Sequence, residues 1–275
     1  VVVHVLTKKG RGYKYAEENP EKFHGVTKFN VIAGEIEKKN YKLTFTEVFS
    51  KTIVSLAEKD EYIVGITAAM TDGCGLEEFA KKFPDRFFDV GIAEEHAVTF
   101  AAGLATQNYK PVCAIYSTFL QRAFDQIIHD VALQNLHVVF VLDRAGIVGE
   151  DGPTHHGVFD LGLFRMLPEI MIMAPADENE LKSCLYTAIN LNKPVIIRYP
   201  RGSGFGVKIT DYQNFDTKAV IIKDGKDVNI VATGNRVHPA IKATEMLAKE
   251  KIDAGVYYFR FVKPIDKEAL FKAAT

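Results

Sequence analysis

Two carboxylates and a histidine, Glu94, Glu95 and His96, lie together in the segment FDVGIAEEH, residues 88–96. The pattern predicts that a helix begins at Ala93, with these side chains in its first turn. A carboxylate placed where a strand passes into a helix can reach a ligand bound at the edge of a sheet. Spacing alone favours a simpler interpretation, in which the acids only complement the helix dipole.

An irregular segment, DRAGIVGEDGPTHHG at 143–157, follows an apolar run, which is where α/β proteins place binding loops. It concentrates the charged and titratable side chains Arg144, Glu150, Asp151, His155 and His156. Adjacent histidines with nearby acids suggest metal ligands, but neighbours in sequence seldom reach one ion. The loop therefore favours acid–base chemistry or substrate binding over a metal site.

The segment YSTFLQR, residues 116–122, follows another apolar run and is expected to open a helix. Tyr116 and Phe119 are aromatic residues whose common fate at such spacing is the core. Arg122 lies one turn further on and is ordinarily solvated. Near a site, its guanidinium offers a planar fork for a phosphate or a carboxylate.

Two arginines, Arg198 and Arg201, lie in RYPRG, between an apolar run and a glycine turn. They fit either a surface linker or a phosphate clamp at the sheet edge. His24, in KFHGV, has apolar neighbours that suggest docking against the protein rather than free solvent.

The composition is that of an ordinary globular protein, with 47% hydrophobic and 25% charged residues. The formal net charge of −1 produces no field that favours nucleic acid or an anionic membrane. No apolar run approaches the ~20 residues of a membrane span. Cys74, Cys113 and Cys184 form no CxxC pattern, so neither a disulfide framework nor a zinc site is indicated. A reducing cytosol is the simplest location.

Apolar runs alternate with helical patterns from residue 44 onwards, and the runs predict strands at 62–68, 86–90, 111–116, 137–143, 170–174 and 194–199. Strands this uniformly apolar are covered on both faces, which is typical of a parallel sheet. The expected fold is therefore a doubly wound α/β structure with a mainly parallel sheet and ligands at the carboxyl ends of its strands.

Two capping boxes mark helix starts within this pattern. Thr44 with Glu47 opens one helix, and Asp177 with Glu180 opens a second over 177–191. A long helix is expected over 119–135.

The two ends of the chain have their own patterns. Residues 1–6 predict a strand by their β-branched content, and 8–42 predicts an exposed linker. The Gly-rich stretch 201–216 is the best domain boundary, and a second, short α/β unit follows at 219–275. Both ends look cut, and we expect a fragment of a longer protein.

The series FHGV, GIAEEHAVTFAAGLA, YSTFLQRAFDQIIHDV, DRAGIVGEDGPTHHGVFD and RYPRG, taken in this order, resembles the 1-deoxy-D-xylulose-5-phosphate synthase family. These are thiamine-diphosphate-dependent enzymes of the transketolase superfamily. The resemblance covers nearly the whole chain. The DRAGIVG loop with its Thr-His and the YSTFLQR helix start are specific to that family, whereas transketolases and pyruvate dehydrogenase β-type subunits share mainly the helix that carries the glutamate.

The resemblance implies a transferase that decarboxylates pyruvate and joins the two-carbon unit to glyceraldehyde 3-phosphate. The products are 1-deoxy-D-xylulose 5-phosphate, a precursor of isoprenoids, thiamine and pyridoxal, and CO₂. It also implies thiamine diphosphate and Mg²⁺ as cofactors and a cytoplasmic homodimer, with neither nucleic acid nor membrane as a partner.

The resemblance assigns residues to the cofactor. Glu94 would bind N1′ of the aminopyrimidine and so promote the imino tautomer that deprotonates the thiazolium carbon. Phe119 would stack on the pyrimidine, and Ile92 would also contact the cofactor. His24 would lie over the reacting carbons as a catalytic residue.

It also assigns residues to the substrates. Tyr116, Arg144 and Arg201 would grip the phosphate of the acceptor. Arg122, Asp151 and His155 would line the reaction pocket, and His155 would take part in catalysis.

One feature of the family is absent from the sequence, the Gly-Asp-Gly motif that binds the diphosphate and Mg²⁺. The expected organisation is therefore the tail of an N-terminal diphosphate-binding domain with a linker at 1–42, a pyrimidine-binding domain at 43–205, a linker at 206–218 and a partial C-terminal domain at 219–275. No metal ligand is expected within this chain, and the fragment alone is expected to be inactive. The alternatives are another enzyme of the superfamily, either a transketolase or a 2-oxoacid dehydrogenase β-type subunit, and a non-catalytic dimerising module.

Overall fold

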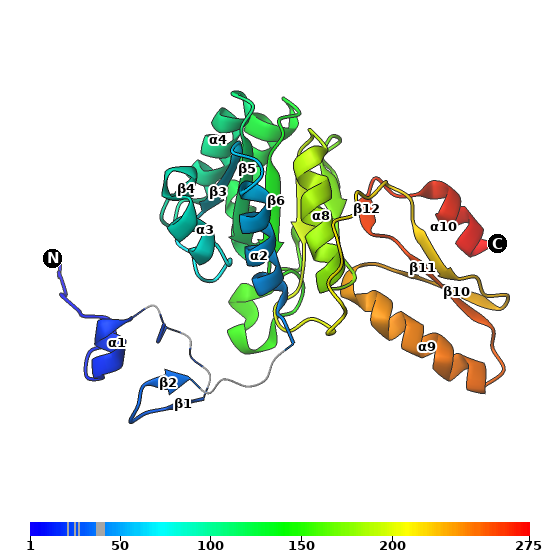
Figure 1. Ribbon diagram of the computed structural model, residues 1–275, viewed down its shortest axis with the longest axis horizontal. Helices are drawn as coiled ribbons and strands as arrows, with labels where there is room; N and C mark the ends of the chain where they lie inside the picture. Colours follow the sequence, from blue (N-terminus) through cyan, green and yellow to red (C-terminus); the bar gives the residue numbers. More distant parts are fainter. Residues whose placement is uncertain (21, 25, 27, 37–41) are drawn as a thin grey trace. The chain divides into compact units, whose positions relative to one another are not determined.

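The computed structural model describes residues 1–20, 22–24, 26, 28–36 and 42–275. The chain divides into two compact units, Val1–Tyr41 and Lys42–Thr275. Figure 1 shows both units, coloured along the sequence.

The first unit contains a short helix, α1 (Lys14–Glu18), and a two-stranded antiparallel pair, β1 (Phe29–Asn30) and β2 (Glu35–Ile36). The prediction of a strand over 1–6 is wrong: this segment pairs with no strand among the described residues, and its apolar side chains are exposed. β-Branched residues favour an extended backbone, but a strand also requires a partner for its N–H and C=O groups.

The second unit is built on a seven-stranded sheet with the order β12-β7-β8-β6-β5-β3-β4. Its strands are β3 (Ile63–Thr67), β4 (Phe87–Asp89), β5 (Lys110–Tyr116), β6 (Val139–Asp143), β7 (Met171–Met173), β8 (Val195–Arg198) and β12 (Phe261–Lys263). All neighbouring pairs are parallel except β12 with β7. The predicted mainly parallel α/β fold is confirmed.

Helices cover both faces of this sheet (Figure 1). One face packs against α2 (Phe45–Ala57), α3 (Glu77–Lys82) and α8 (Glu178–Asn190). The other packs against α4 (Glu94–Ala105), the helical segment that follows β5, and α7 (Asp160–Phe164). Because the strands are buried on both sides, their apolar runs carry no alternation.

The helix predicted over 119–135 is divided into shorter pieces: α5 (Ser117–Leu120), a 3₁₀ turn (Gln121–Ala123), α6 (Phe124–Gln126) and a π-helical stretch (Ile127–Ala132). Ile127, Val131 and Ala132 are all buried. A π turn holds more residues than an α turn, so residues four and five positions after Ile127 can both lie on its face.

The first predicted capping box is confirmed. The backbone N–H of Glu47 donates to Oγ1 of Thr44, and Oε2 of Glu47 accepts from the backbone N–H of Thr44. This reciprocal pair satisfies two of the donors that a helix start leaves open.

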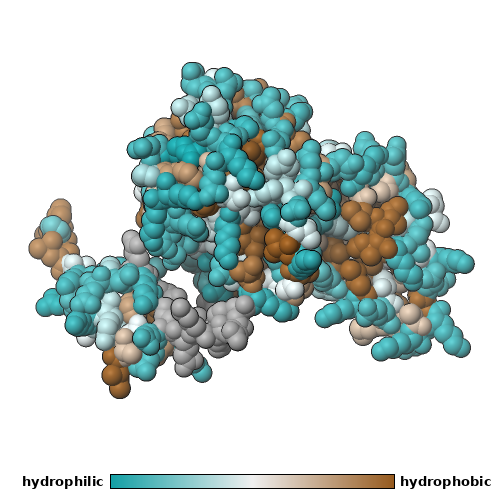
Figure 2. All heavy atoms as spheres, in the orientation of Figure 1, coloured by the Kyte–Doolittle hydropathy of each residue, from teal (hydrophilic) through white to brown (hydrophobic). Residues whose placement is uncertain are grey.

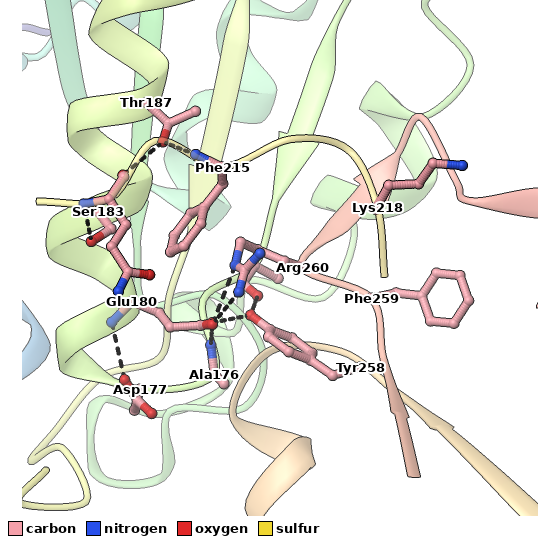
Figure 3. A network of polar contacts seen from close by, with 12 residues as sticks. Ala176, Asp177, Glu180, Ser183, Thr187, Phe215, Lys218, Tyr258, Phe259 and Arg260 are labelled. Atoms are coloured by element: carbon pink, nitrogen blue, oxygen red, sulfur yellow. Dashed lines mark hydrogen bonds and ion pairs between the residues drawn. The ribbon is translucent and has the colours of Figure 1, made fainter. Parts of the chain in front are cut away.

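The second capping box is only half correct. Oδ1 of Asp177 accepts the N–H of Glu180 at 3.0 Å, but the carboxylate of Glu180 does not return to Asp177. It instead accepts the N–H of Ala176 at 3.0 Å, Nη2 of Arg260 at 2.5 Å and the hydroxyl of Tyr258 (Figure 3). The carboxylate of Glu180 therefore joins the backbone just before Asp177 to a buried arginine from a distant part of the chain.

The C-terminal part forms a three-stranded sheet with the order β10-β11-β9. Its elements are β9 (Val220–Lys223), β10 (Val228–Ala232), α9 (Val237–Lys249), β11 (Ala254–Tyr258) and α10 (Lys267–Ala274). The chain then leaves β11 and adds β12 to the edge of the large sheet. This strand and the Glu180–Arg260 pair fasten the C-terminal part to the large sheet.

Apolar side chains remain exposed on the small sheet, namely Val220, Ile221, Ile222, Val228 and Val231. Figure 2 shows brown, apolar side chains gathered over this C-terminal part, within a surface that is otherwise largely polar. No helix among the described residues is both long and apolar enough to cross a membrane. The three cysteines are buried free thiols, and burial raises the pKa of Cys113 to about 12.

Candidate active site

The carboxyl ends of neighbouring strands bring the candidate residues to one edge of the sheet. Tyr116 is the last residue of β5 and lies in register with Asp143, the last residue of β6. Arg198 ends the next strand, β8, and α5 and the 144–157 loop begin at the same edge. Parallel strands place their carboxyl ends together, and this is where such sheets bind ligands.

Glu94 is the first residue of α4 and is only 3% exposed, whereas Glu95 and His96 face solvent. The structure therefore separates the two adjacent acids. Nη1 of Arg122 lies 3.3 Å from Oε2 of Glu94, which brings the predicted pocket arginine to the predicted cofactor carboxylate.

Three rings meet at the same edge of the sheet. Tyr116 and Phe119 stack with their centroids 5.8 Å apart and an interplanar angle of 12°. The 144–157 loop brings His155 edge-on to Phe119 at 5.3 Å and to Tyr116 at 6.3 Å. Nδ1 of His155 lies 3.0 Å from Oγ1 of Thr154. The sheet edge thus carries an aromatic surface with a titratable ring against it.

Charged residues of the loop also gather near Tyr116. The guanidinium carbon of Arg144 lies 4.1 Å from the centroid of the Tyr116 ring. Oδ2 of Asp151 lies 3.6 Å from Nε of Arg144 and 3.1 Å from Nε of Arg201. Asp151 therefore bridges two arginines. Burial raises the pKa of the Tyr116 hydroxyl, so this hydroxyl stays neutral.

Some sequence candidates lie elsewhere or have structural partners. The guanidinium of Arg198 pairs with Asp160, at 2.8 Å and 3.4 Å, which argues against a phosphate clamp at this arginine. Nδ1 of His156 accepts the N–H of Val148 at 3.2 Å and shapes the loop.

Two assigned residues are not brought into this cluster by any described contact. His24 is exposed in the first unit, and Ile92 is 77% exposed just before α4. The side chain of Glu150 lies outside the described residues.

Within the described ranges, no group of three or more His, Cys, Asp and Glu side chains is arranged to hold a metal ion. The charged side chains at the sheet edge instead pair with one another.

Sequence reasoning missed Asp143, which is fully buried at the end of β6. A charged residue that closes a uniformly apolar strand, as in HVVFVLD, was the available signal. Burial raises the pKa of Asp143, and Arg144, Thr46 and the N–H of Arg144 act against this shift.

The known protein families that match this chain agree with this fold. The family model for the transketolase pyrimidine-binding domain matches residues 41–205, and that for the transketolase C-terminal domain matches residues 217–275. The chain belongs to the transketolase family.

Within this family, the chain is similar to 1-deoxy-D-xylulose-5-phosphate synthases. It is 56% identical over 274 residues to the synthase of Halothermothrix orenii and 57% identical over 271 residues to that of Aquifex aeolicus. In each case 98% of this chain matches 43% of the relative, so the chain spans less than half the length of these curated relatives. The resemblance seen in the motifs is confirmed.

Solved structures show the same fold. A split-gene transketolase, solved as an inactive beta4 tetramer, is 32% identical with a TM-score of 0.75, covering 85% of this chain and 76% of that one. The transketolase of Campylobacter jejuni has the same TM-score at 20% identity and covers 94% of this chain and 42% of its own.

Proposed function

We propose that this chain supplies the pyrimidine-binding part of a thiamine-diphosphate-dependent synthase. The enzyme would decarboxylate pyruvate and transfer the two-carbon unit to glyceraldehyde 3-phosphate. It would release CO₂ and form 1-deoxy-D-xylulose 5-phosphate, a precursor of isoprenoids, thiamine and pyridoxal. The observation that carries this proposal is the buried carboxylate of Glu94 at the start of α4, joined through Arg122 to the segment that holds the aromatic residues Tyr116 and Phe119.

The residues present fit the pyrimidine end of the cofactor. Glu94 offers a buried carboxylate acceptor, Phe119 a half-buried ring and Ile92 an exposed aliphatic side chain. In this proposal Glu94 accepts a hydrogen bond from the ring nitrogen, while Phe119 stacks and Ile92 covers the ring. When bound, thiamine diphosphate supplies the electron sink for decarboxylation and carbon–carbon bond formation.

The diphosphate and Mg²⁺ require other residues, since the sequence contains no Gly-Asp-Gly motif. We propose that these ligands lie outside the 275 residues and that His24 approaches the reacting carbons in the assembled enzyme.

The substrate groups of the proposal are anionic. Arg144 and Arg201 would bind the phosphate of the acceptor, because a guanidinium fork matches the oxygens of a phosphate. Tyr116 supports Arg144 through its ring face. Arg122, Asp151 and His155 would line the pocket, with His155 placed to move protons at the reacting carbonyl.

The enzyme is further proposed to be a cytoplasmic homodimer, with domain divisions at 42/43, 205/206 and 218/219. Sedimentation or light scattering on the protein tests the dimer, and a monomeric active enzyme would contradict it.

The decisive experiment incubates the full-length protein with pyruvate, glyceraldehyde 3-phosphate, thiamine diphosphate and Mg²⁺. The expected result is pyruvate-dependent formation of 1-deoxy-D-xylulose 5-phosphate with release of CO₂. Absence of pentulose phosphate from a folded, cofactor-loaded protein would reject the function.

A second candidate is favoured by the likeness to a split-gene transketolase. In that case the chain would act as one subunit of a transketolase or of a related dehydrogenase. Turnover of a ketose phosphate donor, or copurification with a partner that carries Gly-Asp-Gly, would select this alternative. A module that only dimerises would show no turnover with either donor.

A further inference from the structure

The deepest charged group at the sheet edge is Asp143, which ends β6 in the middle of the seven-stranded sheet. Its accessible surface is 0%. A buried carboxylate is costly unless its oxygens accept well-formed hydrogen bonds. The contacts of Asp143 therefore indicate the role of this buried carboxylate.

Both carboxylate oxygens of Asp143 are used, and two of the three donors come from the next residue. Oδ1 accepts the backbone N–H of Arg144 at 2.6 Å. Oδ2 lies 3.0 Å from Nη1 of Arg144 and accepts the hydroxyl of Thr46 at 2.6 Å. Asp143 thus holds Arg144 by its backbone and by its guanidinium at the same time, while Thr46 of α2 fixes the carboxylate from the other side.

The backbone of Arg144 needs this support. Its φ is 60°, in the left-handed region that residues other than glycine seldom enter. The turn directs the side chain back over Tyr116, where the guanidinium lies 4.1 Å from the ring centroid. Nη1 also donates to the carbonyl oxygen of Gly73 at 2.9 Å. A Cβ at Gly73 would lie 2.5 Å from the Tyr116 hydroxyl, so this close approach requires glycine.

One edge of the guanidinium is therefore fastened to the protein. Nη1 contacts Asp143 and Gly73, and the face rests on Tyr116. Nε faces Asp151 at 3.6 Å, on the side where Arg201 also lies, and Nη2 makes no hydrogen bond within the described part of the chain. The Nη2 corner is therefore the part of the guanidinium that we assign to the phosphate.

We propose that Asp143 is a positioning residue that presents the guanidinium of Arg144 to the phosphate of the acceptor. The inference rests on the proposed function. It adds that Asp143, through Arg144, sets the preference for a phosphorylated acceptor. An arginine whose rotamer is fixed by the fold loses little conformational freedom when the phosphate binds. Asp143 acts only through Arg144, so it should affect phosphorylated acceptors and leave the pyruvate half of the reaction unchanged.

The test is the variant Asp143→Asn in the full-length enzyme. Asparagine keeps the shape and one acceptor oxygen but presents an NH₂ group to a partner that is itself a donor. We expect KM for glyceraldehyde 3-phosphate to rise by about tenfold, the factor that 1.4 kcal/mol corresponds to. KM for pyruvate, and turnover with unphosphorylated glyceraldehyde as acceptor, should stay within about twofold of the wild type, well below that tenfold effect.

A matched control is Asp160→Asn, a second buried carboxylate at this edge, which pairs with Arg198. It should lower the thermal stability and leave the preference for phosphorylated over unphosphorylated acceptor unchanged. If Asp143→Asn impairs the reaction with both acceptors equally, as the loss of a purely structural contact would, the inference is overturned.

Thr46→Val provides a second route if Asp143→Asn does not fold, because it removes only the hydroxyl donor. It should reduce the preference for the phosphorylated acceptor by about threefold, a smaller step in the same direction. A Thr46→Val enzyme with the full wild-type preference would also overturn the inference. A wild-type enzyme that forms no pentulose phosphate would instead reject the proposed function itself, so the two failures are distinguishable.

Discussion

Arg122 and Glu94 join a largely exposed guanidinium to a buried carboxylate, with Nη1 3.3 Å from Oε2. The side chain of Arg122 is 55% exposed and that of Glu94 is 4% exposed. An ion pair whose cation is solvated contributes only about 0–1 kcal/mol. The pair therefore does little for stability, and the Glu94 carboxylate could exchange it for a stronger hydrogen-bond partner.

The first prediction concerns Glu94. In the full-length enzyme, Glu94→Gln should lower kcat by about 10²-fold or more, the usual loss when a group that promotes proton transfer is removed. The exposed neighbour provides the control: Glu95→Gln should keep near wild-type turnover. Steady-state rates with pyruvate and glyceraldehyde 3-phosphate measure both. Equal activity of both variants would indicate that this chain has no catalytic part.

The second prediction separates two nearby arginines. Arg201→Ala should raise KM for glyceraldehyde 3-phosphate by about tenfold, because a charge-assisted contact to phosphate is lost. Arg198→Ala should leave that KM unchanged. It should instead destabilise the fold by about 3 kcal/mol, since it leaves the buried carboxylate of Asp160 unpaired. Kinetics and urea unfolding measure the two effects, and the reverse pattern would place the phosphate site at Arg198.

The third prediction concerns the segment after β8. The buried carboxylate of Glu178 accepts the N–H groups of Phe205, Gly206 and Val207 at 2.9, 2.5 and 3.0 Å. Glu178→Ala should cost about 3 kcal/mol, because three backbone N–H groups lose their charged acceptor.

Urea unfolding of the Glu178→Ala variant, together with faster proteolysis at 205–207, would show this loss. The neighbouring Asn179→Ala, which removes an exposed acceptor for Thr210, should cost about 1 kcal/mol or less. Similar costs for the two variants would mean that the segment is held by other contacts.

The fourth prediction is a pH dependence at Asp60. Burial opposes ionisation there, but hydrogen bonds from Lys110 at 2.8 Å and from the N–H of Tyr62 at 3.0 Å outweigh it and lower the pKa of Asp60. The ionised carboxylate therefore contributes stability that is complete above the unfolded pKa of about 3.9 and is lost as the pH falls through the folded pKa.

Urea unfolding of wild type and Asp60→Asn tests this linkage. The wild type should be more stable by about 1 kcal/mol at pH 7, and the difference should shrink below about pH 4. A difference that stays constant down to pH 3 would show that the charge of Asp60 is not involved.

The fold was largely predictable, for a specific reason. Strands β3, β5, β6 and β8 are buried on both faces, so each appears in the sequence as an unbroken apolar run between polar stretches. The capping box at Thr44 is equally local, since both of its partners lie within one helical turn. The segment 1–6 misled the same reasoning, because strand pairing is a property of two segments.

The site was predictable only in part. Motif order marked the carboxyl ends of β5 and β6, but the local pattern could not separate Glu94 from Glu95, which have the same chemistry one residue apart. The structure separates them by burial alone. The assignment of Arg201 but not Arg198 to the substrate stays a prediction, although Asp160 already occupies the fork of Arg198.

By itself, the sequence determined the α/β class, the helix starts and the short list of side chains that lie at the sheet edge, because these depend on apolar periodicity and on residues close together in the chain. Only the tertiary structure decided which of those side chains have a partner. Glu180 turns from its helix to Arg260, and Asp143 joins Thr46 to Arg144. Buried charges seek partners through space, and those partners are set by packing between segments far apart in sequence.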